Sequence, residues 1–136
     1  SEPIAARRAG AAPQVFPLSD VGYNPYAGVV VTRSRLLAEQ PDRARRLIRA
    51  VRRGWQAYLD DPAPANAVMQ RLNATMEPGT FAEVAAVQKP LIESEYTRAN
   101  GLGTMELSRW QQLARQLLDL GIIDRADPED AFVNLN

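Results

Sequence analysis

Hydrophobic residues recur at helical spacing along most of the chain after residue 33. The clearest case begins at Asp42 and runs to Leu59, where apolar side chains fall at i, i+3, i+4 and i+7, the stripe of an amphipathic helix. Pro41 precedes it, in a position that the first helical turn tolerates. The same spacing predicts further helices at residues 4–10, 33–40, 64–72, 80–92 and 105–120.

Residue types that favour the start or the end of a helix define the boundaries of these predicted helices more closely. Gly10 and Gly121 are expected to end the helices that precede them, with Ile122 making the hydrophobic contact of a Schellman-type end. Thr80 and Thr104 are placed to cap the helices that follow them. Pro90 should kink or split the helix in which it lies.

Two short segments have a different pattern. Residues 14–18 and 27–32 are rich in β-branched and aromatic side chains, and the second contains three consecutive valines, as expected of a buried strand in an α/β protein. Two short strands do not form a stable sheet alone. We therefore expect these strands to pair either with another part of a larger protein or with a second copy across a dimer. Together with the opening at Ser1, this suggests that the chain is a fragment of a larger protein.

Composition excludes several classes of function. The 136 residues contain sixteen basic and sixteen acidic side chains, so the net charge gives no case for nucleic acid as a partner. For the arginines of residues 43–53, a solvated helix face is favoured over phosphate binding. The absence of Cys and His removes the usual zinc sites, thiol catalysis and Ser-His-Asp triads. We therefore predict no enzyme activity, no catalytic residue, no metal and no cofactor.

Two places are candidates for binding a small molecule. The loop at residues 22–26 places Tyr23, Asn24 and Tyr26 between the two expected strands, where aromatic and amide side chains commonly line a cleft. Alternatively, the two tyrosines only cover the edge of a core. Glu2 could bind a ligand amine or guanidine through a charge-assisted hydrogen bond, although a surface carboxylate is its ordinary role. Trp55 and Trp110 lie on apolar stripes, which favours core packing over ligand stacking.

Several stretches occur together in a familiar order: residues 1–6 with Gly10, residues 15–18, the loop 22–26, residues 41–44 with Ala50, residues 54–62, residues 72–73 with Met76, residues 103–110 and residues 120–124. In this order the chain resembles the C-terminal part of periplasmic solute-binding proteins of ABC importers. The closest group is the thiamine-pyrimidine-precursor, riboflavin, sulfonate and taurine binders, together with the pyrimidine synthases of the same fold.

The resemblance implies an α/β, helix-rich fold: a partial type II periplasmic-binding-protein fold, the C-terminal portion of a two-lobed clamshell. Residues 1–32 would form the end of one lobe and the crossover strands, and residues 33–136 the C-terminal helical portion of the same structural unit. Glu2 corresponds to a pocket-side acidic residue of the family, and Tyr23, Asn24 and Tyr26 correspond to the loop before a cleft-side strand.

The function implied is that of an importer's substrate-binding component, which captures a pyrimidine precursor, a sulfonate or a similar small organic solute by hinge closure. The expected partners are the solute, an ABC permease at the membrane, and a missing N-terminal lobe or a second copy. The expected location is the periplasm, or outside the cytoplasm on a lipid anchor. Two alternatives remain: a helical interaction module forming a strand-exchanged dimer, and a fragment of a pyrimidine-synthase-like enzyme, whose family relies on His, Cys and iron.

Overall fold

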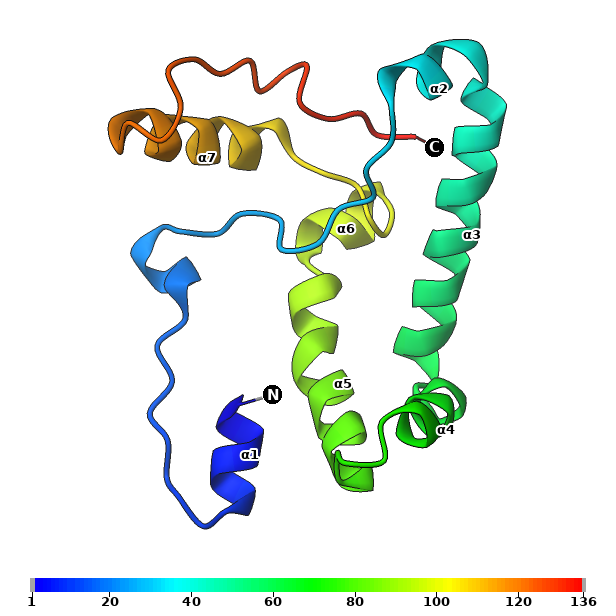
Figure 1. Ribbon diagram of the computed structural model, residues 1–136, viewed down its shortest axis with the longest axis vertical. Coiled ribbons are helices and arrows are strands. Elements are labelled where there is room, and N and C mark those ends of the chain that lie inside the picture. Colours follow the sequence, from blue (N-terminus) through cyan, green and yellow to red (C-terminus); the bar gives the residue numbers. More distant parts are fainter. Residues whose placement is uncertain (1, 136) are drawn as a thin grey trace. The chain divides into compact units, whose positions relative to one another are not determined.

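The computed structural model describes residues 2–135, and the regular structure in this range is helical (Figure 1). The elements in chain order are α1 (Glu2–Arg8), the 3-10 helix η1 (Leu18–Val21), α2 (Ser34–Glu39), α3 (Pro41–Asp60), α4 (Ala63–Leu72), α5 (Pro78–Ile92), α6 (Glu95–Asn100) and α7 (Leu107–Asp119).

The predicted α/β fold class is wrong, because the described part of the chain contains no strand. Residues 14–17 are irregular and Leu18 begins η1, while residues 27–32 are irregular throughout. A strand requires a neighbour to accept and donate its backbone hydrogen bonds. No backbone hydrogen bond joins residues 27–32 to another described residue, and Val31 is 82% exposed. The partial type II periplasmic-binding-protein fold is therefore not what the structure shows.

The helix ends that depend on glycine are confirmed. Gly10 and Gly121 adopt positive φ angles of 84° and 64°, which only glycine adopts readily. After α1, Ala11 donates its backbone N–H to Ala6 O at 3.0 Å. After α7, Ile122 donates to Leu117 O at 2.9 Å. Each is the backbone hydrogen bond from residue i+5 to residue i that defines a Schellman motif. These two helix ends are therefore set by residues that are close in sequence.

The two predicted threonine caps are wrong. Thr80 lies inside the first turn of α5 and is buried, because Pro78 already begins that helix. Thr104 is also buried, and α7 starts three residues later, after Glu106. Pro90 does not split α5, which ends two residues beyond it. The chain then forms α6, which the sequence pattern did not predict and whose N-cap is Ser94, accepting from the Thr97 N–H at 3.2 Å.

The chain divides into two compact units. Unit 1 comprises the residues up to 15 together with 49–103, and unit 2 comprises residues 16–48 together with those from 104 onward. Helix α3 is continuous and contributes residues to both. The sequence suggested a different division, between residues 1–32 and residues 33–136, and that division stays a prediction.

Unit 1 is built on α5, against which α1 and α4 pack (Figure 1). Its buried apolar side chains include Ile4, Leu59 and Ala85. Lys89 on α5 donates its ammonium to Leu59 O at 2.7 Å, which satisfies a carbonyl near the end of α3. Trp55 is 44% exposed and makes an edge contact with Tyr58, so the prediction that Trp55 lies in the core is wrong.

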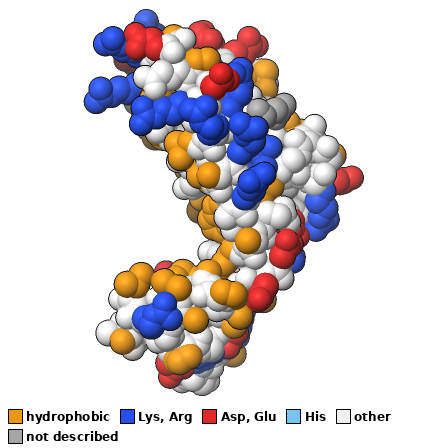
Figure 2. All heavy atoms as spheres, turned by 90° about the vertical axis from the view of Figure 1, so that its right-hand side faces the viewer, with side chains coloured by type: hydrophobic (Ala, Val, Ile, Leu, Met, Phe, Trp, Pro, Cys, Tyr) orange, Lys and Arg blue, Asp and Glu red, His pale blue; other side chains and the backbone are white. Residues whose placement is uncertain are grey.

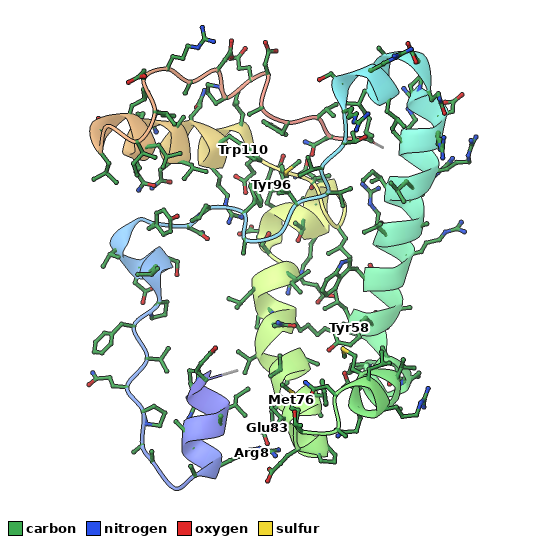
Figure 3. The ribbon with its side chains drawn as sticks, in the orientation of Figure 1. Arg8, Tyr58, Met76, Glu83, Tyr96 and Trp110 are labelled. Atoms are coloured by element: carbon green, nitrogen blue, oxygen red, sulfur yellow. The ribbon has the colours of Figure 1, made fainter. Side chains whose placement is uncertain are left out.

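An arginine holds α1 on α5. Arg8 donates from Nη1 to Glu77 Oε2 at 2.7 Å and from Nη2 to Glu83 Oε1 at 2.6 Å (Figure 3). The hydrogen bond to Glu83, followed by that to Glu77, raises the pKa of Arg8 above its ordinary value, so the guanidinium stays charged. Gly79 lies beneath this group: a Cβ there would overlap Arg8 Nη2 and approach Cζ at 3.3 Å.

We expect Gly79→Ala to be neutral or destabilising by up to about 1 kcal/mol. The gain in helix propensity is offset by displacement of Arg8 from its two carboxylates. Gly54→Ala is the matched control, because Gly54 also lies in a helix but no described atom outside that helix comes within 4 Å of where a Cβ would stand. That control should stabilise the protein by roughly 0.5–1 kcal/mol. Urea midpoints measure both, and equal stabilisation would show that the Arg8 contact contributes nothing.

Candidate functional site

The residues predicted to bind a ligand fall in both units. Glu2 belongs to unit 1, whereas Tyr23, Asn24 and Tyr26 belong to unit 2. The structure thus gives two separate surroundings, and each is described by itself.

In unit 1, Glu2 lines a pocket of about 530 Å³. The pocket lies between α1 and the segment that enters α5, in the region where Figure 3 labels Arg8, Met76 and Glu83. Its walls combine small apolar side chains with carboxylates and hydroxyls: Glu2, Ala5, Arg8, Ala9, Thr75, Met76, Glu77 and Thr80.

The charges of this pocket favour hydrogen-bond donors in a ligand. Arg8 is already shared by Glu77 and Glu83, so its positive charge is balanced within the protein. Glu2 adds a further carboxylate at the first turn of α1, where the helix dipole favours a negative charge. Thr80 is only 7% exposed and lines the pocket, and no described residue accepts or donates a hydrogen bond at its hydroxyl. A small molecule with amine or amide N–H groups matches this lining.

In unit 2, Arg109 on α7 holds the loop that contains the other three predicted residues. Its Nε donates to Asn24 O at 2.9 Å, and its Nη2 donates to Asn24 Oδ1 and to Pro25 O, both at 3.0 Å. The guanidinium also lies over the ring of Tyr26, 3.9 Å from its centroid. This geometry uses the planar fork of arginine, which lysine does not have.

Aromatic side chains continue this cluster. Trp110 lies 5.9 Å from Tyr26 and 5.6 Å from Phe132 between ring centroids, and its ring is nearly parallel to that of Phe132. Trp110, labelled in Figure 3, thus packs against two aromatic rings, as its place on the apolar stripe predicts. Its Nε1 is buried without a hydrogen-bond partner in the described part of the chain.

The polar groups of the loop are mostly occupied by unit 2 itself. The hydroxyl of Tyr26 accepts from the Glu106 N–H at 2.6 Å, and Gly22 O accepts from the side chains of Gln112 and Gln116. Asn24 is engaged by Arg109, whereas Tyr23 is exposed. A ligand role for Tyr23, Asn24 and Tyr26 stays a prediction.

Sequence reasoning missed the anchoring role of Arg109, which entered only as part of a family pattern. The sequence offered no local signal for this role, because the loop that Arg109 contacts lies more than eighty residues away and adjacent helix positions such as 109 and 110 do not face each other. Among the described residues, no group of three or more acidic side chains is arranged to hold a metal ion. None of the described helices combines the length and apolar character needed to cross a bilayer.

Comparison with known proteins matches residues 1–65 to the family model described as NMT1/THI5 like. The matched region contains Glu2, the loop at residues 22–26, α2 and α3. No curated protein and no solved structure shows significant similarity to the chain. The match supports the family resemblance, and it identifies neither a subtype within the family nor which part of a family member this chain represents.

Proposed function

We propose that this chain acts as a solute-binding component of an ABC importer and has no enzymatic activity. The observation that carries the proposal is the match of residues 1–65 to the NMT1/THI5-like family, a family with a solute-binding and transport theme that also includes synthases. The chain contains neither the His nor the Cys on which the synthases rely, which favours the binding role. In this proposal the chain works in the periplasm, or outside the cytoplasm on a lipid anchor, and its partner is an ABC permease at the membrane.

The proposed solute is a small organic molecule such as a pyrimidine precursor or a sulfonate. Glu2 supports an amine-bearing ligand, because its carboxylate lines the unit 1 pocket together with Thr80. A charged acceptor would hold an amine or amino-pyrimidine N–H group more strongly than a neutral acceptor. A sulfonate instead requires donors, and Arg8, the cation in the pocket lining, is already engaged by two carboxylates. The amino-pyrimidine class is therefore preferred.

Thermal shift with an aminopyrimidine, with taurine and with riboflavin tests this proposal. A ligand present at about 100 times its Kd should stabilise the protein by about 2.7 kcal/mol. We expect Glu2→Gln to weaken aminopyrimidine binding at least about tenfold, because a charge-assisted hydrogen bond becomes a neutral one. Glu129→Gln, an exposed acidic residue away from the pocket, is the control. Flat titrations with all three probes would count against solute binding by this chain.

A second candidate function is a helical interaction module that dimerises through strand exchange. The exposed valines of residues 29–31, whose backbone groups lack backbone partners among described residues, favour it. Such a segment can pair with the same segment of a second copy. A melting temperature that rises with protein concentration would support this candidate, and a concentration-independent one would reject it.

A further inference from the structure

Arg8 differs from the exposed arginines of this protein. Figure 2 shows basic side chains gathered over the upper part of the side on which α3 lies, and five of the six arginines of α3 are exposed. The side chain of Arg8 is only 28% exposed, compared with 46% for Arg45 and 82% for Arg35. Its guanidinium is held by Glu77 and Glu83, so this arginine positions the helix that carries it.

Helix α1 is attached to the rest of unit 1 by few contacts. Ile4 is the one buried residue among its seven, and Arg8 supplies the ion pairs to α5 and to the residue before it. No backbone hydrogen bond joins residues 3–15 to a described residue beyond residue 15. An isolated helix this short is not stable in water, so α1 depends on these side chains for its order. A segment with so few contacts opens locally without unfolding of its surroundings.

Helix α1 also forms one wall of the unit 1 pocket. That wall consists of α1 residues and the residue that follows the helix: Glu2, Ala5, Arg8 and Ala9. The other wall comes from the first turn of α5 and the segment before it: Thr75, Met76, Glu77 and Thr80. Although Thr80 lines the pocket, it is only 7% exposed. Since half of the lining moves with α1, displacement of this helix uncovers the other half, including Thr80.

The ion pairs of Arg8 are of a kind that is easily released. Arg8 Nη1 lies 2.7 Å from Glu77 Oε2, while Nη2 and Nε lie 2.6 and 3.2 Å from Glu83 Oε1 (Figure 3). The two carboxylate side chains are 74% and 52% exposed, so water and dissolved ions reach both pairs. Ion pairs at such sites contribute little individually and are weakened by salt. Arg8 therefore holds α1 closed by contacts that the solvent can replace.

We propose that α1 is a flap over the unit 1 pocket and that the ion pairs of Arg8 hold it closed. The flap turns about residues 11–15, which have no regular structure and follow the glycine that ends α1. An open flap lets a solute reach Thr80, and a closed flap returns Glu2 to the lining. The inference rests on the proposed function for the identity of what enters the pocket, whereas the movement belongs to the free protein.

Thiol labelling tests this movement directly, because the chain contains no cysteine. Thr80→Cys places a single thiol in the pocket lining, behind the flap. Ala85→Cys is the reference, because Ala85 is equally buried on the same helix but does not line the pocket. With an uncharged aromatic disulfide reagent, we expect position 80 to react at least about tenfold faster than position 85, which becomes accessible only when unit 1 unfolds.

Removal of the ion pairs should open the flap. In the Thr80→Cys background, Arg8→Gln should accelerate labelling about fivefold, and about 0.5 M salt should act in the same direction on the unchanged Arg8. Arg7→Gln is the matched control, because Arg7 lies on the same helix, is exposed and carries the same charge. This control should change the rate less than about twofold. Neither substitution should alter labelling at position 85.

Amide hydrogen exchange of the unsubstituted chain gives a second test, which does not depend on how the cysteine variants fold. The amides of α1 should exchange faster than those of α5, and faster still at about 0.5 M salt. Equal labelling rates at positions 80 and 85, equal effects of Arg8→Gln and Arg7→Gln, or α1 amides as protected as those of α5 would each overturn the flap. No solute is needed, so a chain that binds none of the three probes can still confirm the flap, and a chain that binds the aminopyrimidine can still refute it.

Discussion

Arg109→Ala is expected to destabilise unit 2 by about 2–3 kcal/mol. The side chain donates three hydrogen bonds, to Asn24 O, Asn24 Oδ1 and Pro25 O. Hydrogen bonds from charged donors contribute about 1.5–3 kcal/mol when buried and less where solvent competes, and the contact with the Tyr26 ring adds roughly 0.5–1 kcal/mol. Because the loop at residues 22–26 has no regular structure of its own, it is held by such contacts, to which Gln112 and Gln116 add hydrogen bonds at Gly22 O.

Urea unfolding of two further variants makes this expectation specific. Arg109→Lys keeps the charge but replaces the planar fork by one ammonium, and should recover less than half of the loss. Arg115→Ala removes an exposed arginine from the same helix and should cost under about 0.5 kcal/mol. Similar midpoints for the alanine variants at 109 and 115 would show that the loop does not depend on Arg109. Amide hydrogen exchange across residues 22–26 should accelerate only in the Arg109 variants.

Most of the helices were predictable from sequence because their causes are local. The apolar stripe of α3 and the proline at its first position place that helix to within a residue or two, and the glycine after α7 places the end of α7. Helix starts were predicted less well. At α5 the proline at the first position decided the start, and Thr80, two residues later, became a buried side chain instead of a cap.

The predicted strands failed because a strand depends on groups far away in the sequence. Val29, Val30 and Val31 have high strand propensity, but propensity describes how a side chain fits a pleated surface that already exists. Without a neighbouring strand in the described chain, the segment remains irregular and exposed. The three consecutive valines that predicted a buried strand therefore form an exposed apolar segment in the structure.

The candidate site was predictable only in part, for a related reason. Residue type identified Glu2 and the aromatic loop as candidates, and Glu2 does line a pocket. Which polar groups remain accessible depends on tertiary contacts that the sequence does not reveal. Arg109 reaches back over more than eighty residues to Asn24, and Tyr26 accepts from Glu106, so both loop residues are tied into the protein's own structure.

Trp110→Ala should destabilise unit 2 by about 3 kcal/mol, an effect as large as that expected for Arg109→Ala. The indole packs against the rings of both Tyr26 and Phe132, and its removal deletes both contacts. Replacing a buried Trp by Ala costs roughly 3–5 kcal/mol, and partial exposure of Trp110 places it at the lower end.

Trp110→Phe is the sharper test, because it separates ring packing from the indole N–H. Since Nε1 is buried without a partner among the described residues, the phenyl ring removes an unsatisfied donor while retaining most of the aromatic contact. The expected cost is below about 1 kcal/mol, although the side chain becomes smaller. Trp55→Ala, at an exposed indole, should cost much less than Trp110→Ala. Urea midpoints measure all three, and a Phe variant as unstable as the Ala variant would mean that Nε1 makes a hydrogen bond that stabilises unit 2.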